Sequence, residues 1–110
     1  MRLGEKGRYR RLGELYKASN GFFSQNPVYF KFKYEDGTGM QKDEFKLFSN
    51  WIMQSGRAVI ETNSLDSFEK GDKVKLDGDE YLINRVNTHV YSSLNGIKRI
   101  TNKRTVIYCE

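Results

Sequence analysis

The sequence predicts an all-β domain, mainly antiparallel and built as a small barrel or sandwich. Five or six short runs alternate apolar with polar residues, which is the pattern of strands with one wet face. Turn residues separate these runs at close spacing, as they do in small barrels and sandwiches. A chain of 110 residues suffices for one domain with a modest core. We expect this domain over residues 27–110, with one long loop at about residues 36–56.

The N-terminal residues 1–26 give a weaker pattern, and we expect them to form a basic arm or a short helix ahead of the barrel. Leu12, Leu15 and Tyr16 fall at helical spacing, and Gly21 stands where such a helix would end. Further glycines in the same segment oppose a helix, because glycine weakens helix interiors. The prediction is therefore a flexible basic arm that leads into a short helix.

Residues 28–34 alternate clearly, with apolar side chains at every second position, and predict a strand that Pro27 precedes. The next segment, residues 38–55, is ambiguous. Phe45, Phe48 and Ile52 fit one face of an amphipathic helix, but an irregular loop with inserted aromatic residues fits the sequence equally well. Its aromatic side chains either complete the core of the domain or form a contact with another subunit.

The second half of the chain predicts two more strands and a hairpin. Arg57–Thr62 and Arg104–Cys109 read as strands, and Asn95-Gly96 offers a turn between the hairpin and the last strand. Around Asp77-Gly78-Asp79 two alternating runs flank a short turn. Asp-Gly in this position is a strong hairpin signal, because glycine accepts a positive φ without a steric clash.

The net charge of +5 is unevenly distributed along the chain. Residues 1–17 carry six basic and two acidic side chains, residues 35–80 carry six basic and eleven acidic ones, and residues 81–110 carry five basic and one acidic. Basic ends around an acidic middle suit contact with a polyanion or head-to-tail contact between neighbouring subunits. The residues expected at a polyanion contact are Arg8, Arg10, Arg11, Arg99, Lys103 and Arg104.

Sequence signals for catalysis, metals and cofactors are missing. His89 is the only histidine and has no nucleophile motif beside it, so we expect a structural role. Cys109 is the only cysteine, which excludes an internal disulfide and a cysteine metal cluster, and we expect it to be a small structural residue near the end of the last strand. The acidic residues between positions 66 and 80 lack the ligand spacing of a calcium loop. We expect a protein that is not an enzyme and that uses no metal or cofactor.

No apolar run is long enough to cross a membrane, and the N-terminus lacks the core of a signal peptide, so we expect synthesis in a reducing intracellular compartment and no membrane contact.

The order of features in residues 28–109 is similar to that of the small head-tail joining proteins of tailed bacteriophages, also called head-closure, stopper or minor capsid proteins. The segments that carry the resemblance are GRAVIETN, GDKV, DGDEY, YLI and the final TVIYCE.

The resemblance implies a small β-barrel that assembles as a homo-oligomeric ring at the neck of the virion, after synthesis in the cytoplasm of the bacterial host. Its partners would be the portal or adaptor protein and the tail-completion proteins, and the ring would help to retain packaged DNA by non-specific contact. The loop that faces the channel or a neighbouring subunit would contain Lys42, Phe45, Lys46, Phe48, Trp51 and Met53. The acidic edge that meets basic residues of a neighbour would contain Asp66, Asp72, Asp77 and Asp79.

Two other classes fit the sequence. A nucleic-acid-binding barrel of the SH3-like or OB type would use the basic ends directly, with aromatic residues beside them for base stacking. An adaptor domain would bind one protein partner through its exposed loop.

Overall fold

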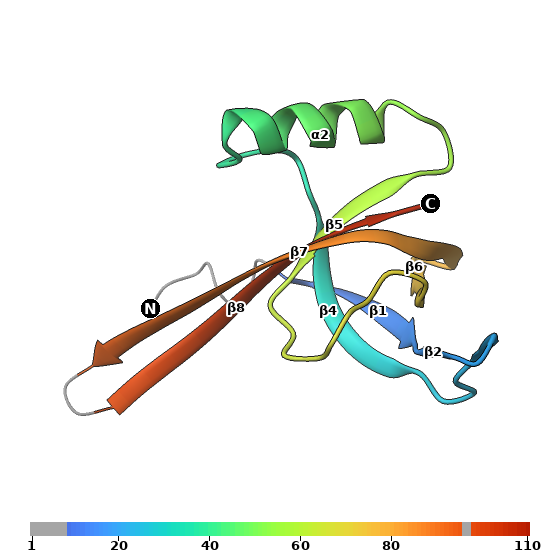
Figure 1. Cartoon of the computed structure of the whole chain (residues 1–110), viewed down its shortest axis with the longest axis horizontal. Coiled ribbons are helices and arrows are strands. Elements are labelled where there is room, and N and C mark those ends of the chain that lie inside the picture. The colour runs from blue at the N-terminus through green and yellow to red at the C-terminus, as the bar shows by residue number, and fades with distance from the viewer. Residues whose placement is uncertain (1–8, 96–97) are drawn as a thin grey trace.

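The computed structural model describes residues 9–95 and 98–110 and confirms the all-β fold (Figure 1). Among these described residues, six antiparallel strands close a barrel in the order β1-β4-β5-β8-β7-β6, and one helix lies outside it. The barrel strands are β1 (Arg11–Tyr16), β4 (Val28–Tyr34), β5 (Ala58–Thr62), β6 (Lys73–Leu76), β7 (Asp79–Asn95) and β8 (Lys98–Cys109). The remaining elements are the small hairpin of β2 (Ala18–Ser19) and β3 (Phe22–Phe23) and the helix α2 (Lys42–Ile52).

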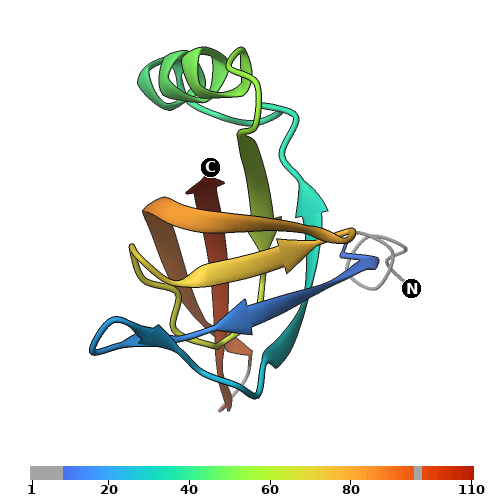
Figure 2. The ribbon, with the colours of Figure 1, turned by 90° about the vertical axis from the view of Figure 1, so that its right-hand side faces the viewer.

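The helix expected in the N-terminal segment is wrong, because Arg11–Tyr16 is a barrel strand. In Figure 2 this strand, β1, lies between β4 and β6 and closes the barrel. Its side chains follow a period of two, so that Leu15 is buried and Leu12 is exposed. A boundary at residue 26 therefore does not separate an arm from the barrel. Gly13 faces the ring of Phe30, where a Cβ atom would lie 2.7 Å from a ring carbon.

The predicted strands at residues 28–34 and 57–62 and the predicted hairpin are confirmed as β4, β5 and β6–β7. The turn of the hairpin is two residues long, since Leu76 pairs with Asp79. Asp77 and Gly78 have φ values of 51° and 90°, which is the left-handed backbone of a type I′ turn. This turn suits the twist of the two strands that it joins.

Residues 38–55, which fitted a helix or a loop, contain the helix α2. Asp43 and Glu44 lie in its first turn, where the helix dipole favours negative charge. The helix packs Phe48 against the outer face of the sheet, on Val59 and on β8. Figure 2 shows α2 above one end of the barrel.

The interior of the barrel holds the main core, to which every barrel strand contributes. Its buried members are Leu15, Phe30, Phe32, Ala58, Ile60, Phe68, Val74, Leu76, Ile83, Ile107 and Cys109. The five residues of β5 are all buried, because the barrel covers one face of this strand and α2 and its neighbours cover the other. A central strand with no wet face explains why GRAVIETN alternates poorly.

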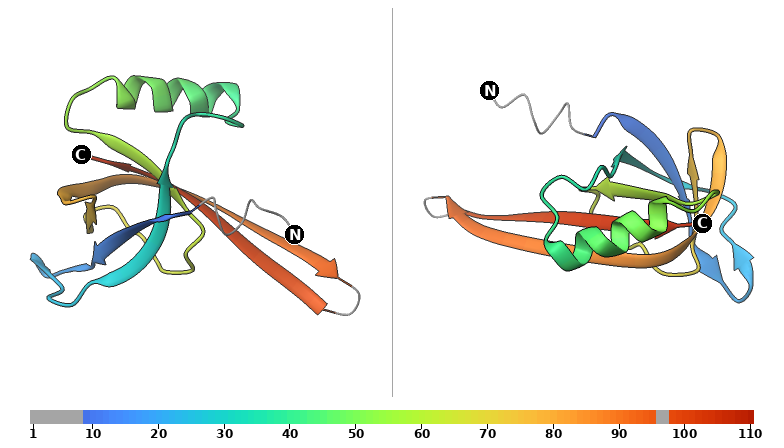
Figure 3. Two further views of the ribbon diagram at one scale, coloured as in Figure 1. Left: turned by 180° about the vertical axis from the view of Figure 1, so that it is seen from behind. Right: turned by 90° about the horizontal axis from the view of Figure 1, so that it is seen from above.

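Strands β7 and β8 run far beyond the barrel and form a two-stranded ribbon (Figures 1 and 3). Strand β6 pairs with β7 only up to Leu82, and β5 pairs with β8 only from Thr105 onward. We call residues 88–95 and 98–104 the ribbon. Strand β8 begins at Lys98 instead of the expected Arg104. The turn expected at Asn95-Gly96 falls partly on residues outside the described part of the chain.

Candidate interaction surfaces

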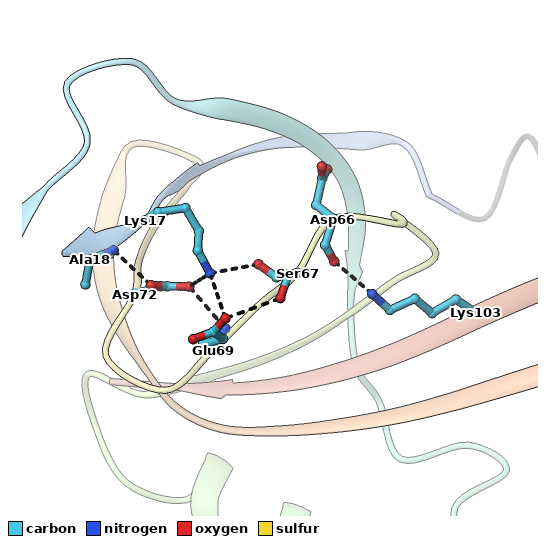
Figure 4. A network of polar contacts seen from close by, with 7 residues as sticks. All are labelled: Lys17, Ala18, Asp66, Ser67, Glu69, Asp72 and Lys103. Atoms are coloured by element: carbon cyan, nitrogen blue, oxygen red, sulfur yellow. Dashed lines mark hydrogen bonds and ion pairs between the residues drawn. The ribbon is translucent and has the colours of Figure 1, made fainter.

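Asp72, predicted at a subunit interface, is a buried residue that organises the loop before β6 (Figure 4). Its carboxylate accepts hydrogen bonds from the Lys17 ammonium at 2.5 Å and from the backbone N–H groups of Ala18 at 2.9 Å and Glu69 at 3.1 Å. Lys17 also donates to the carbonyl of Ser67. Because Asp72 is only 3% exposed in the single chain and its carboxylate has three internal donors, Asp72 ties the loop to the segment that joins β1 to β2.

Asp77 and Asp79, at the hairpin turn, lie on the surface as the predicted acidic edge requires. The Asp77 carboxylate accepts from the Arg11 guanidinium at 2.9 Å and from the Tyr34 hydroxyl at 2.8 Å. The same guanidinium lies 5.1 Å from the centre of the Tyr34 ring. Burial and the hydrogen bond to Asp77 raise the pKa of Tyr34. Arg11, predicted to contact a polyanion, therefore already has an acidic partner within the chain.

The other predicted polyanion contacts differ in their surroundings. Arg8 lies outside the described residues, Arg10 is exposed just before β1, and Arg99 belongs to β8. Lys103 donates to the backbone carbonyl of Asp66 at 2.8 Å, so that its ammonium ties the ribbon to the loop before β6 (Figure 4). The carboxylate of Asp66 accepts from a serine hydroxyl two residues away.

The base of the ribbon is held by a buried charged cluster that the sequence reasoning missed. Glu61, fully buried on the outer face of β5, accepts a hydrogen bond from Arg104 Nε at 2.7 Å and another from the Tyr9 hydroxyl at 2.5 Å. Arg104 Nη2 lies 3.5 Å from an oxygen of Glu35, and Lys33 Nζ lies 4.0 Å from Glu61. Arg104 is therefore an internal partner of two acids and not the free polyanion contact that we predicted.

The pKa values of the two carboxylates in this cluster, Glu35 and Glu61, are shifted in opposite directions. Burial alone would raise the pKa of Glu61, but the hydrogen bonds from Tyr9 and Arg104 outweigh it and lower that pKa. Burial raises the pKa of Glu35, the backbone N–H of Gly37 offsets this in part, and the nearby charge of Glu61 adds to the rise. Glu61 is thus the ionised partner of Arg104, whereas Glu35 holds its proton more firmly than an exposed glutamate does.

The six residues predicted for a channel or subunit-contact loop divide between core and surface. Phe48 is buried against the sheet, and Trp51 is half-buried. The indole N–H of Trp51 donates to the Cys109 carbonyl at 3.1 Å, and the Arg57 guanidinium lies 3.9 Å from the centre of a Trp51 ring. These two aromatic residues attach α2 to the barrel. The exposed members are Lys42, Phe45, Lys46 and Met53.

A groove of about 440 Å³ separates the first half of α2 from β7. Its walls are Asp43, Glu44 and Leu47 on the helix and residues 85–89 on the strand. One carboxylate oxygen of Glu44 is buried, and no hydrogen-bond partner for it lies among the described residues. His89, expected to be structural, is an exposed residue on the wall of this groove.

A second recess, of about 290 Å³, is formed by residues of β3, β6 and β7 together with Glu110. In Figure 1, β6 lies at the end of the molecule opposite the far end of β7 and β8. The recess is lined by Phe23, Lys73, Glu80, Tyr81, Leu82 and Glu110. Phe22, next to Phe23 in the β2–β3 hairpin, is 78% exposed. The hairpin turns at Asn20-Gly21, where both φ values are positive. Asn-Gly is a recognised hairpin signal that the helical reading of this segment overlooked.

The described residues contain no group of three or more histidine, cysteine, aspartate or glutamate side chains placed to hold a metal ion. Cys109 lies at the end of β8 as expected and is buried, and burial raises the pKa of its thiol to about 12. In the same part of the chain, no helix has the length and apolar character needed to span a membrane. No family model matches the chain, and no curated protein or solved structure matches it either.

Proposed function

We propose that this chain is a structural protein of a tailed-bacteriophage virion and forms a homo-oligomeric ring at the neck, between the portal or adaptor and the tail. The proposal starts from the resemblance carried by the GRAVIETN, GDKV and DGDEY segments. The closed barrel formed by these segments is the kind of fold that the resemblance implies. The protein would be made in the bacterial cytoplasm and would bind the portal or adaptor and the tail-completion proteins.

The observation that carries the proposal is the ribbon. Within the described residues, positions 89–95 and 98–104 pair only with each other, and Thr88 pairs with Thr105 where the ribbon leaves the barrel. A two-stranded ribbon alone in water is marginally stable, and its open edges offer backbone groups to another chain. A barrel that projects such a ribbon fits a subunit whose contacts are completed by its neighbours.

The helix α2 supplies the second supporting surface. Lys42, Phe45, Lys46 and Met53 are exposed on it, and Met53 is 80% exposed although it is a large apolar residue. Apolar side chains beside lysines fit a surface that contacts a partner protein or lies near packaged DNA. Retention of DNA by such a ring would be steric and electrostatic and would involve no turnover.

A nucleic-acid-binding barrel is the second candidate, and the charge of the C-terminal region favours it. Residues 81–109 contain five basic residues and no acidic one. Two of the five, Lys103 and Arg104, are engaged inside the chain, which weakens this candidate. Fluorescence anisotropy with single- and double-stranded oligonucleotides across a salt series separates the two proposals. Submicromolar binding that survives physiological salt would contradict the neck protein, whereas weak binding lost steeply with salt reports scattered phosphate contacts.

The direct test of the neck proposal is a nonsense mutation in the gene, made in a phage that carries it. We expect purified wild-type virions to contain the protein by mass spectrometry. The mutant should accumulate free tails and heads that have lost their DNA, and a suppressor host should restore infectious particles. Normal plaques from the mutant, together with virions that lack the protein, would contradict the proposal.

A further inference from the structure

We infer that copies of this chain associate head to tail, with the far end of the ribbon of one copy seated in the recess at the opposite end of the next copy. The inference rests on the proposed function, because it identifies the two surfaces through which the ring would form. The far end of the ribbon comprises residues 93–95 and 98–100, and the recess is the one between the β2–β3 hairpin and the start of β7.

The recess is both apolar and acidic. Leu82 is 47% exposed and Phe23 40% exposed, and together they present a surface that water contacts in the single chain. Two carboxylates belong to the same recess. Glu80 is 59% exposed, with Lys73 Nζ 3.8 Å away, and Glu110 accepts a hydrogen bond from the Asn84 side chain at 2.8 Å. With Lys73 counted against Glu80 and Glu110, the recess carries one net negative charge.

The far end of the ribbon has the complementary composition. It contains the apolar residues Leu94 and Ile100 and the basic residues Lys98 and Arg99, with no acid among its members. Leu94 pairs with Arg99 across the two strands, and Asn95 pairs with Lys98. Two basic and two apolar residues therefore occupy adjoining register positions, as an apolar and acidic recess requires of its occupant.

These two surfaces lie at opposite ends of the longest axis of the molecule (Figures 1 and 3). The molecule measures 46 Å along that axis, so one copy cannot bring the ribbon into its own recess. A contact between unlike surfaces on two copies is heterologous, and it generates a ring when the rotation closes and a filament when it does not. Contact between two ribbons is disfavoured, because it would oppose basic residues to basic residues.

A second copy fits the ribbon better than a nucleic acid does. At the base of the ribbon, Lys103 and Arg104 are bound to groups of their own chain. The far end adds Lys98 and Arg99, which match in number the two carboxylates of the recess. A nucleic acid would leave the exposed aromatic and aliphatic residues of the recess without a role, whereas a second copy buries them.

The test uses two charge-reversed proteins and sedimentation velocity. One protein carries Glu80→Lys and Glu110→Lys, and the other carries Lys98→Glu and Arg99→Glu. The wild type should associate as its concentration rises to about 1 mM, and each reversed protein alone should associate at least about tenfold more weakly. An equimolar mixture should recover association, because both contacts in an alternating assembly then join opposite charges.

A charge-matched control and an apolar substitution accompany these proteins. Lys31→Glu with Lys70→Glu makes the same charge change as the ribbon variant at exposed positions outside both surfaces, and it should associate as the wild type does. Phe23→Ser removes a partly exposed apolar side chain of the recess without a charge change, and it should weaken association. Circular dichroism would show that all variants are folded.

Three outcomes would overturn the inference: a wild type that stays monomeric up to about 1 mM, reversed proteins that associate normally, or a mixture that fails to recover. Loss of oligonucleotide binding on ribbon reversal, with association unchanged, would assign the ribbon to nucleic acid instead. The neck proposal fails separately. If the nonsense mutant makes normal virions while the charge-swap experiment succeeds, the chain is a head-to-tail oligomer with another function.

Discussion

The two halves of the β7–β8 pair differ in how many neighbouring strands they have. Near the barrel, Ile83 and Ile107 lie on strands with neighbours on both sides and are buried in the core. In the ribbon the same strands have only each other, and Val90 is 64% exposed. Folding of the barrel therefore depends on the half near the barrel, and we propose that the other half serves assembly. The difference teaches that stability and association should respond to different substitutions.

The largest effect is expected in the barrel half. Phe32 is fully buried and packs beside Phe30 in the interior, so Phe32→Ala should lower the free energy of unfolding by about 3–5 kcal/mol. Val90→Ala in the ribbon should change it by no more than about 0.5 kcal/mol. Urea denaturation followed by circular dichroism measures both. Similar losses for the two variants would mean that the ribbon and the barrel form one cooperative core.

The charged cluster where the two halves meet should give the next largest effect. Glu61 is fully buried, and Glu61→Gln removes the charge that faces partly buried Arg104, so it should lower the free energy of unfolding by about 2–3 kcal/mol. Glu35→Gln should be neutral or stabilising at pH 7, because burial disfavours the charged form of Glu35. Urea denaturation of the two isosteric variants provides the comparison. Equal destabilisation by both would refute the opposite roles that we assign to these carboxylates.

The same cluster predicts a pH dependence with two opposing parts. The folded-state pKa of Glu61 is below the ordinary 4.5, so its contribution to stability is complete above 4.5 and is lost as the pH falls through the folded value. The folded-state pKa of Glu35 is above 4.5, so protonation of Glu35 adds stability as the pH falls through that raised value towards 4.5. The unfolding free energy should be measured from pH 7 to pH 3. Glu61→Gln should lack the decrease in stability that protonation of Glu61 causes, and Glu35→Gln should lack the increase that protonation of Glu35 causes. Unchanged profiles in both variants would contradict these assignments.

The surface ion pair at the hairpin turn should give the smallest effect. Asp77→Asn keeps a residue that tolerates the left-handed backbone but removes the charge beside Arg11. Both side chains are largely exposed, so we expect a loss of about 0.5–1 kcal/mol in the free energy of unfolding, smaller at high salt. Denaturation with and without added salt is the measurement. A loss as large as that of Glu61→Gln would show that exposure does not separate the two ion pairs.

Most of the fold could be predicted from local pattern. Residues 28–34 and the Asp77-Gly78 hairpin carry strong period-two and turn signals, and both are present as expected. Strand β1 was missed because Leu12, Leu15 and Tyr16 fit a helix as well as a strand, and their strand conformation depends on pairing with β4 and β6. Local residues do not encode such distant partners.

The candidate surfaces were harder to predict. Glu61 within an otherwise apolar strand was a sign of a buried charge with a partner, but the sequence does not indicate that the partner is Arg104, 43 residues later. The start of the ribbon was missed because residues 98–103 alternate poorly, so the strand appeared to begin at Arg104. The recess joins the β2–β3 hairpin to β6, β7 and the last residue of the described chain, and only the folded barrel brings these segments together.

The most direct measurement is made on a shortened protein that lacks the outer part of the ribbon. Val90 pairs with Lys103, so replacing residues 91–102 by Asn-Gly would join these two residues through a two-residue turn like the one between β6 and β7. We predict that the free energy of unfolding stays within about 1 kcal/mol of the full-length value. We also predict that sedimentation velocity shows no self-association. A shortened protein that cannot fold, or that associates as the full chain does, would contradict the separation of barrel and assembly arm.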